Sequence, residues 1–585
     1  MSKIIIYQIL VRLFGNRNTN NKFYGSLQEN GCGKFDDITE RALDEIKRMG
    51  ITHVWYTGVI EHATMTDYSV FGISRDDPDV VKGKAGSPYA IKDYYDVDPD
   101  LARKPANRMQ EFEALVERTH RAGLKVIIDF VPNHVARTYR SDAMPDVKSG
   151  LQANVGIKAR NNLGDNDNTD IAFDPNNNFY YIIGQAFVVP QDYDAGGGNF
   201  HHPLKDKRFD EYPAKASGND VFSATPSIDD WFETVKLNYG VDYASGEQFF
   251  DPIPDTWLKM LDILLFWADK NIDGWRCDMC EMPPVQFWQY AIARVKKHHP
   301  KILFIGEAYS PSSYNNLITA GFDCLYDKAG LYDLLRATVN GNAGFNRMQD
   351  YLRSPVAGVE QHMLAFLENH DEQRFASVQF AGTAEKAIPL MTLAATLHTA
   401  PVMIYFGQEL GVTAAGATGF SGDDGRTSIF DYTFIPELCW WANGGAYDGG
   451  QLSAEKQALR NFYVKLLSIC CKESAIAVGT FHDLAVDNYN SAGFNPYLNY
   501  AFARYDAHSG NRLIIFVSID RQHSPNLTLR ISRDLFPEML PDADTEYVID
   551  DILNGGASTT IRGTELFDKG LHIASQHAAI ILKIG

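Results

Sequence analysis

The chain has 585 residues, of which 45% are hydrophobic, so it can bury a large core and form more than one domain. Its formal net charge of −20, from 74 acidic and 54 basic residues, argues against nucleic acid or an anionic membrane as a partner. This composition fits a soluble protein that binds a neutral or cationic ligand.

The seven cysteines follow no spacing that is typical of a disulfide framework. Cys277 and Cys280 are separated by two residues, but no second pair of cysteines or histidines accompanies them, which favours buried thiols over a metal site. Free thiols predict a reducing compartment, and the apolar run at residues 4–6 is too short to span a bilayer. We therefore expect a cytoplasmic protein that has no membrane partner.

The first part of the chain alternates between strand and helix patterns. Strands are expected at residues 4–10, 51–57 and 124–130, and helical periodicity covers residues 37–49 and 107–122. The third strand is largely apolar, which is typical of a parallel sheet covered on both faces. The asparagine-rich loop at residues 16–21 is interpreted as a turn, with a bound calcium ion as the alternative.

Residues 135–254 show no helix–strand rhythm and are rich in asparagine, glycine and aspartate. A segment of this length is unlike an ordinary loop, so we expect a small inserted domain. The alternation then resumes, with five further strands at residues 273–278, 302–307, 323–326, 363–367 and 402–405, and helices at 257–270, 284–298, 313–320, 331–352, 384–399 and 455–471.

Eight strands that alternate with helices predict an α/β fold, a closed (β/α)8 TIM barrel. We expect the barrel to comprise residues 1–134 and 255–471, with the inserted domain B, residues 135–254, after its third strand. Only short strand patterns follow residue 472, at 500–505, 512–519, 527–531 and 578–584. Residues 472–585 are therefore predicted to form a C-terminal antiparallel β-sandwich.

Polar side chains follow the ends of four of the predicted barrel strands, numbers three, four, five and seven. They are His134, Arg276, Asp278, Glu307, His370 and Asp371. The carboxyl ends of barrel strands meet at one mouth, where the active sites of such barrels lie. Each side chain alone could belong to a structural ion pair, but the set of six predicts a site.

Three carboxylates at one barrel mouth suit the hydrolysis of a glycoside by two acids with different roles. Arg276 and Asp278 are two residues apart on a strand and point the same way, so the guanidinium favours the ionised carboxylate that a nucleophile requires. Glu307 follows an apolar run, and apolar surroundings favour the protonated form that a general acid requires. Asp371 would bind sugar hydroxyls and hold the ring in a distorted shape.

Four segments in this order, at residues 129–134, 274–278, 306–307 and 369–371, resemble the signature regions of the α-amylase superfamily, glycoside hydrolase family 13. Residues 234–238, Thr-Val-Lys-Leu-Asn, resemble the additional region of its cyclomaltodextrinase and neopullulanase branch. The resemblance covers nearly the whole chain, including the barrel, the insertion after the third strand and the C-terminal sandwich.

The resemblance implies retaining cleavage of α-glucosidic bonds through a covalent glycosyl–enzyme. By position, Asp278 matches the nucleophile of the family, Glu307 its acid/base and Asp371 its transition-state stabiliser. The resemblance also implies a set of substrate-binding residues, which are Tyr89, His134, Arg276, His370 and Arg374. A loop residue that serves only packing is the alternative for Tyr89 and for Arg374.

Two departures from the family pattern are informative. Glu281 and Met282 stand where many α-amylases carry a Lys-His pair that contacts substrate and calcium, so no metal ligand is assigned although Asn133 is present. Ala90 stands where many exo-glucosidases of the family carry an aspartate, which favours an amylase or dextrinase. The chemistry needs no cofactor, and a structural calcium ion is left open.

The leading hypothesis is a hydrolase of maltodextrins, cyclodextrins or similar α-glucan oligosaccharides. The first alternative is a transglycosylase or isomerase, in which a sugar hydroxyl replaces water as the acceptor. The second is a non-catalytic sugar-binding relative, which would be marked by the loss of a catalytic carboxylate, and none is missing here. We expect a monomer or homodimer; substrate length and linkage do not follow from the sequence.

Overall fold

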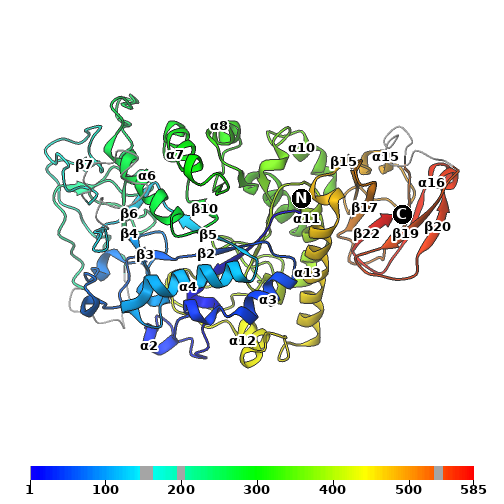
Figure 1. Cartoon of the computed structure of the whole chain (residues 1–585), viewed down its shortest axis with the longest axis horizontal. Helices are drawn as coiled ribbons and strands as arrows, with labels where there is room; N and C mark the ends of the chain where they lie inside the picture. Colours follow the sequence, from blue (N-terminus) through cyan, green and yellow to red (C-terminus); the bar gives the residue numbers. More distant parts are fainter. Residues whose placement is uncertain (1, 145–161, 194–204, 532–543) are drawn as a thin grey trace.

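The computed structural model describes residues 2–144, 162–193, 205–531 and 544–585. Residues 145–161 and 194–204 of the predicted insertion, and residues 532–543 of the predicted sandwich, lie outside the described residues. The molecule is elongated, with the N-terminal barrel toward one end and the C-terminal strands at the other (Figure 1).

Eight parallel strands form one sheet. They are β1 (Ile5–Leu10), β2 (His53–Thr57), β5 (Lys125–Phe130), β10 (Gly274–Cys277), β11 (Leu303–Gly306), β12 (Cys324–Tyr326), β13 (Met363–Leu364) and β14 (Val402–Tyr405). The sheet closes on itself, because β1 pairs with both β2 and β14, and Ala365, just after β13, forms a parallel bridge with Val402. The predicted (β/α)8 barrel is confirmed.

Large apolar side chains fill the barrel interior, as expected for parallel strands buried on both faces. Every residue of β1 and β2 is buried. The cluster inside the barrel consists of Ile6, Trp55, Ile127, Ile305, Cys324, Tyr326, Tyr332, Leu364, Phe366 and Met403. Polar groups can enter this interior only at its ends, which confines the chemistry to the strand termini.

Helices surround the barrel (Figure 1). They include α3 (Glu40–Arg48), α4 (Arg108–Arg121), α6 (Asp255–Ala268), α7 (Val285–His298), α8 (Tyr314–Ala320), α9 (Asp333–Val339), α10 (Met348–Leu352), α11 (Ala387–Thr396) and α13 (Ala454–Lys472). Helix α3 shows why they form, because the Thr39 hydroxyl caps its first turn, Leu43 and Ile46 face the core, and basic residues occupy its last turn.

The chain leaves the barrel along β6 (His134–Ala136) and comes back along β9 (Thr234–Lys236), which pairs with β6 in antiparallel fashion. Between them the described residues contain one further small pair, β7 (Tyr181–Ile182) with β8 (Ala214–Lys215). This arrangement places an insertion after the third barrel strand. Its boundaries at residues 135 and 254 stay a prediction.

The C-terminal part is antiparallel. A six-stranded sheet pairs in the order β15 (Thr480–Asp483), β16 (Asn499–Asp506), β17 (Asn511–Ser518), β22 (Ala579–Ile584), β19 (Glu546–Asp551) and β20 (Thr559–Arg562). A second sheet pairs β18 (Asn526–Leu529) with β21 (Leu571–Ala574). The predicted C-terminal β domain is thereby confirmed.

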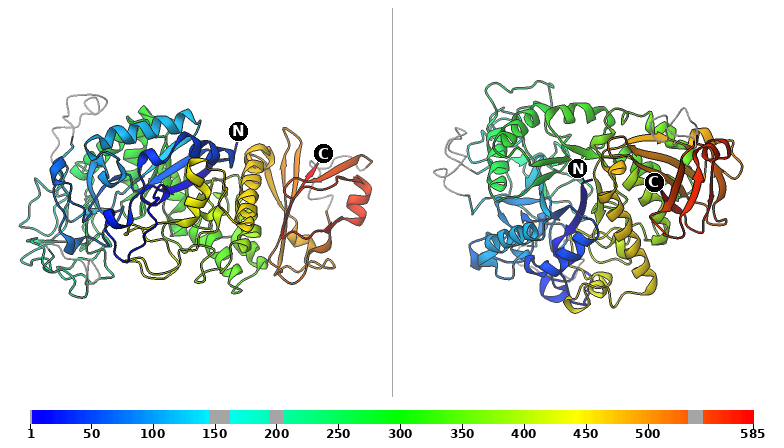
Figure 2. Two further views of the ribbon diagram at one scale, coloured as in Figure 1. Left: turned by 90° about the horizontal axis from the view of Figure 1, so that it is seen from below. Right: turned by 45° about the vertical axis from the view of Figure 1, so that its right-hand side comes forward.

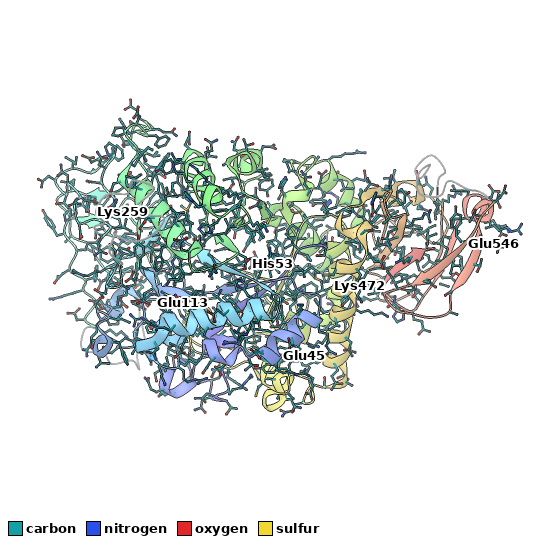
Figure 3. The ribbon with its side chains drawn as sticks, viewed as in Figure 1. Glu45, His53, Glu113, Lys259, Lys472 and Glu546 are labelled. Carbon is teal, nitrogen blue, oxygen red and sulfur yellow. The ribbon has the colours of Figure 1, made fainter. Side chains whose placement is uncertain are left out.

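Helix α13 stands between the barrel and the C-terminal strands (Figure 2). Lys472, its last residue, lies at this junction, whereas Glu546 lies at the far end of the molecule (Figure 3). The buried Arg504 of β16 ties the two parts together by donating to the backbone oxygen of Leu397 in the barrel. Among the described residues, no helix is both long and apolar enough to cross a lipid bilayer.

Candidate active site

The ends of the barrel strands surround a pocket of about 380 Å³, which we call the mouth pocket. Its lining residues are Lys82, Ser87, Tyr89, His134, Trp231, Glu233, Thr234, Asp278, Met279, Glu307, Tyr309, Asp371, Ile429 and Phe430. Asp278 follows β10 directly and Glu307 follows β11, so their backbones are fixed by neighbouring strands. The structure thus brings the three predicted carboxylates to one pocket.

One guanidinium joins two of these carboxylates. Arg276, which is fully buried on β10, places Nη1 2.8 Å from Asp278 Oδ1 and Nη2 2.6 Å from Glu307 Oε1. Asp371 Oδ2 lies 4.0 Å from the same group. The guanidinium is further held over the rings of Trp55 and Tyr89. Arg276 is therefore the electrostatic centre of the site, although it does not line the pocket.

Asp278 experiences opposing effects. Burial, and then the neighbouring Glu307 carboxylate, raise the pKa of Asp278 well above its usual value, whereas Arg276 acts to lower it. The sequence indicated only the effect of Arg276, which favours the ionised form of Asp278. Arg276 therefore supports the ionised form of Asp278 against burial and against the second carboxylate.

Three donors contact the carboxylate of Glu307. The backbone N–H of Met279 donates to Oε2 over 2.8 Å, and the Tyr309 hydroxyl donates to Oε1 over 2.6 Å. Arg276 completes the set as an ion pair. Met279 adopts a left-handed backbone conformation, with φ of 41°, which is uncommon for a residue with a side chain. The backbone after β10 is therefore turned to present its N–H to Glu307.

A chain of hydrogen bonds runs behind the pocket through His370. The Gln8 amide donates to His370 Nδ1 over 2.8 Å, so Nε2 carries the ring proton and faces the Tyr89 oxygen at 2.5 Å. Nε2 also lies 3.1 Å from Asp371 Oδ2. Burial, and then Arg276, lower the pKa of His370 well below its usual value, which keeps the ring neutral. His370 thus orients Tyr89 and Asp371 and is covered by them.

Asp129, at the end of β5, completes this chain. Its carboxyl accepts from the Tyr89 hydroxyl at 3.3 Å and from Trp55 Nε1 at 3.1 Å. Burial raises the pKa of Asp129 to about 6. The sequence indicated Asp129 only as part of a motif, and the structure shows that it holds Tyr89 in place.

His134 lies on β6, where the insertion meets the barrel. Its ring lies 5.1 Å from that of Trp231, and burial, followed by Lys236, lowers its pKa to about 3. Trp231 is partly exposed in the pocket. Beside it, Lys82 forms a 3.0 Å ion pair with the buried Glu233. The insertion therefore supplies an aromatic ring and the acidic member of this ion pair to the pocket wall, and the barrel part of the chain supplies Lys82.

The contacts of Arg374 are those of its packing alternative. Its guanidinium is fully buried, lies 3.1 Å from Glu368, and donates to the Thr427 hydroxyl and the Phe406 backbone oxygen over 2.7 and 2.8 Å. It is not one of the residues that line the mouth pocket. Arg374 instead joins the segment after β13 to the segment after β14.

The pocket also contains residues that the sequence did not indicate as site residues. They are Lys82, Ser87, Trp231, Glu233, Thr234, Met279, Tyr309, Ile429 and Phe430. Tyr309 carried a signal that could have revealed it, because it stands two residues beyond Glu307 at the end of the same strand. Met279 directly follows Asp278, and Thr234 stands on β9. The others come from long connections, in which residue order does not indicate which side chains face the pocket.

The surroundings of Asn133 do not fit a calcium ion. Asn133 Oδ1 accepts from the ammonium of Lys236 over 2.9 Å, and its Nδ2 donates to the backbone oxygen of Gly218 over 2.6 Å. Lys236 also pairs with Asp220. A positive charge thus already occupies the position beside this oxygen. In the described part of the chain, no group of three or more His, Cys, Asp or Glu residues is arranged to hold a metal ion.

The comparison with known protein families agrees with this geometry. A family model described as "Alpha amylase, catalytic domain" matches residues 8–149 and 253–428, which make up more than half of the chain. The chain belongs to the α-amylase family. This confirms the family resemblance of the signature segments, and the two matched segments of this α-amylase-family protein flank its insertion.

Two similar proteins are distant relatives of this α-amylase-family protein. It is 25% identical over 436 residues to a cyclomaltodextrin glucanotransferase from Geobacillus stearothermophilus, a match that covers 70% of this chain and 50% of that protein. It is 21% identical over 488 residues to Alpha-amylase 2 from Dictyoglomus thermophilum, which covers 82% and 64% of the two chains. The chain therefore spans between half and two-thirds of the length of these two relatives.

Among solved structures, a maltogenic α-amylase from Thermotoga neapolitana is similar over nearly the whole molecule. The TM-score is 0.59 at 18% sequence identity, and the match covers 99% of this chain and 98% of that one. At this identity the likeness shows the shared fold, which includes the barrel and the C-terminal strands.

Proposed function

We propose that this α-amylase-family protein is a retaining glycoside hydrolase that cleaves α-glucosidic bonds of maltodextrins or related α-glucan oligosaccharides. The observation that carries the proposal is the contact of Asp278 and Glu307 with the two ends of the Arg276 guanidinium, at 2.8 and 2.6 Å. Carboxyl groups held by one guanidinium lie close together. This supports the spacing of about 5–5.5 Å in retaining enzymes over the roughly 6.5–9.5 Å of inverting ones.

In the proposed first step, Glu307 gives its proton to the glycosidic oxygen while a carboxylate oxygen of Asp278 bonds to the anomeric carbon. The bond to the leaving sugar breaks and its electron pair stays on that sugar's oxygen. In the second step, Glu307 takes a proton from water, whose oxygen attacks the anomeric carbon and releases Asp278. Arg276 offsets the charge of Asp278 before it attacks and after it leaves.

The remaining pocket residues suit a neutral sugar. Tyr89 and Trp231 offer aromatic faces on which the apolar face of a sugar ring can pack. Asp371, whose side chain is 41% exposed, can accept hydrogen bonds from sugar hydroxyls, and His370 holds it in position. Lys82 and Glu233 neutralise each other at the pocket wall, so their pair does not call for a charged substrate.

Transglycosylation is the alternative, and the similarity to a cyclomaltodextrin glucanotransferase supports it. It uses the same glycosyl–enzyme, with a sugar hydroxyl in place of water. A non-catalytic sugar-binding role is disfavoured, because all three carboxylates line the pocket.

The experiment that tests the proposal is the product profile on maltoheptaose, with the anomeric configuration followed by NMR in the first minutes. Short products released in the α-configuration support a retaining α-glucan hydrolase, and their lengths distinguish endo from exo cleavage. Products longer than the substrate identify a transglycosylase. Products released in the β-configuration contradict the retaining mechanism, and the absence of reaction on maltoheptaose, cyclodextrin and pullulan contradicts the hydrolase.

We also propose that the protein works in a reducing compartment such as the cytoplasm. All seven cysteines lie in the described residues and none forms a disulfide. Cell fractionation tests this proposal, and recovery of the protein outside the cytoplasm would contradict it.

A further inference from the structure

Glu281 marks one of the two departures from the family pattern, and the structure shows what this side chain contacts. One of its oxygens accepts from the backbone N–H of Tyr309 over 2.6 Å, and both accept from that of Ser310 over 3.1 and 3.2 Å. The Ser313 hydroxyl donates to the same carboxylate over 2.5 Å. Glu281 therefore fixes the segment that follows β11 at several points.

This segment carries Tyr309, which lines the mouth pocket and donates its hydroxyl proton to Glu307 Oε1 over 2.6 Å. Burial, and then the Glu307 carboxylate, raise the pKa of Tyr309 well above its usual value, so the phenol keeps its proton and acts as a donor. A hydrogen bond from a neutral donor stabilises the ionised form of a carboxyl group.

Tyr309 also differs from the other donors. Arg276 contacts Asp278 as well as Glu307, so its charge does not distinguish one carboxylate from the other. The donor at Met279 is a backbone N–H in the turn after β10, so it does not depend on which side chain stands at position 279. Among the described residues, Tyr309 is the side chain that donates a hydrogen bond to Glu307 without contacting Asp278.

We propose that Tyr309, held in place by Glu281, is a positioning residue that stabilises the ionised form of Glu307, and so favours its second task, the removal of a proton from water. The inference rests on the proposed function and deepens it. It gives a role to Glu281, which replaces the basic residue of many relatives, and it assigns a site residue that the sequence did not indicate.

Other titratable groups surround Glu307 from every side. They are Arg276, Asp278, Cys280, Tyr326, His370 and Asp371. Tyr309→Phe leaves the side chains of these groups in place and removes the hydroxyl that donates to Glu307. The change in pH dependence that follows from Tyr309→Phe therefore reports on the hydrogen bond to Glu307.

The test uses the full chain and two substrates. For maltoheptaose, kcat/KM falls at alkaline pH where Glu307 loses the proton that it must donate. For α-maltosyl fluoride, whose leaving group needs no acid, we expect the second step to limit kcat, which should fall at acidic pH where Glu307 cannot accept a proton. These two falls are the alkaline and the acidic limb of the pH profiles. In Tyr309→Phe, both limbs should shift to higher pH by about one unit, because the Glu307 carboxylate loses one hydrogen bond.

Two further variants sharpen the test. Glu281→Gln keeps the size of the side chain but weakens its hydrogen bonds to the backbone of Tyr309 and Ser310. Both limbs should therefore shift in the same direction as in Tyr309→Phe, by a smaller amount. Tyr314→Phe is the matched control, because Tyr314 lies in the same segment and its hydroxyl has no hydrogen-bond partner among the described residues. Its pH profile should equal that of the wild type.

If Tyr309→Phe is folded, as judged by circular dichroism, and neither limb moves, the inference is wrong while the proposed function stands. If the wild type cleaves no glycoside, the proposed function fails instead. The titration midpoint of the Glu307 carboxyl, followed by ¹³C NMR and assigned with Glu307→Gln, then decides the inference. An upward shift of this midpoint in Tyr309→Phe supports it, and an unchanged midpoint overturns it.

Discussion

The ammonium of Lys236 lies 2.9 Å from the side-chain oxygen of Asn133, where the insertion joins the barrel. Lys236 is 2% exposed, and Asp220 provides its counter-charge. Burial lowers the pKa of Lys236, and the Asp220 carboxylate opposes this effect. The ammonium group of Lys236 thus connects the insertion to the segment that follows β5.

We therefore predict that this protein does not depend on calcium. Activity and Tm should be the same with a chelator as with added calcium. Lys236→Met should lower the stability by about 1–3 kcal/mol, because it leaves Asn133 and Asp220 without their donor. Lys215→Met, which alters a more exposed lysine of the insertion, is the control. A Tm that falls by several degrees in the chelator would contradict this prediction.

Asp278→Asn removes the proposed nucleophile but keeps the shape of the side chain. The amide oxygen can still accept from Arg276, so the fold should persist. Turnover of maltoheptaose should fall by roughly 10⁴-fold or more, since no covalent intermediate can form. Initial rates and circular dichroism check both parts. A folded variant with a near-normal rate would show that another residue is the nucleophile.

Trp231→Ala removes an aromatic face from the pocket wall without touching the three carboxylates. The KM for maltoheptaose should rise about tenfold, which corresponds to roughly 1.4 kcal/mol of lost binding, while kcat stays within about twofold. Trp440→Ala serves as the control, because Trp440 is 38% exposed and does not line the pocket. An unchanged KM would exclude Trp231 from substrate binding.

Asp327, directly after β12, provides a test of pH dependence. It is fully buried, accepts from the Tyr351 hydroxyl over 2.6 Å and from the Leu331 N–H over 2.8 Å, and burial raises its pKa to about 6. A folded-state pKa above the unfolded value of about 3.9 means that the folded state binds the proton more tightly. The resulting stabilisation is complete below about pH 4 and is lost as the pH rises through about 6.

Asp327→Asn removes this titration. The Tm of the variant relative to the wild type should therefore increase as the pH is raised from about 4 to about 7, because only the wild type loses the contribution of Asp327 in this window. Thermal unfolding at several pH values measures the difference. A difference that is constant across the window would show that Asp327 does not titrate there.

Two kinds of information in the sequence were sufficient for the fold and for much of the site. Apolar strand patterns alternating with helical periodicity predicted the barrel, and the closed eight-stranded sheet confirms it. The polar residues that directly follow strand patterns, such as Asp278 and Glu307, are located by local order alone. Strand ends of a closed barrel converge, so their positions in the chain already predict that they share one mouth.

Contacts between distant segments do not follow from local sequence patterns. The sequence paired Arg276 with Asp278, its neighbour on the strand, but the structure adds Glu307 from the next strand. It left open whether Arg374 binds substrate or serves packing, and the structure directs this side chain to Glu368. Such pairings depend on how side chains fill the space between elements.

The sequence by itself thus determined the barrel, the place of the insertion and the strand ends at which the carboxylates stand, because periodicity and chain order are local properties. Only the tertiary structure decided that Tyr309 contacts Glu307 and that Lys236 occupies the position beside Asn133. The Lys236–Asn133 contact joins residues that lie 103 positions apart in the chain. The Tyr309–Glu307 contact is local in the chain, but it depends on the conformation of the segment after β11, which Glu281 holds from another strand end.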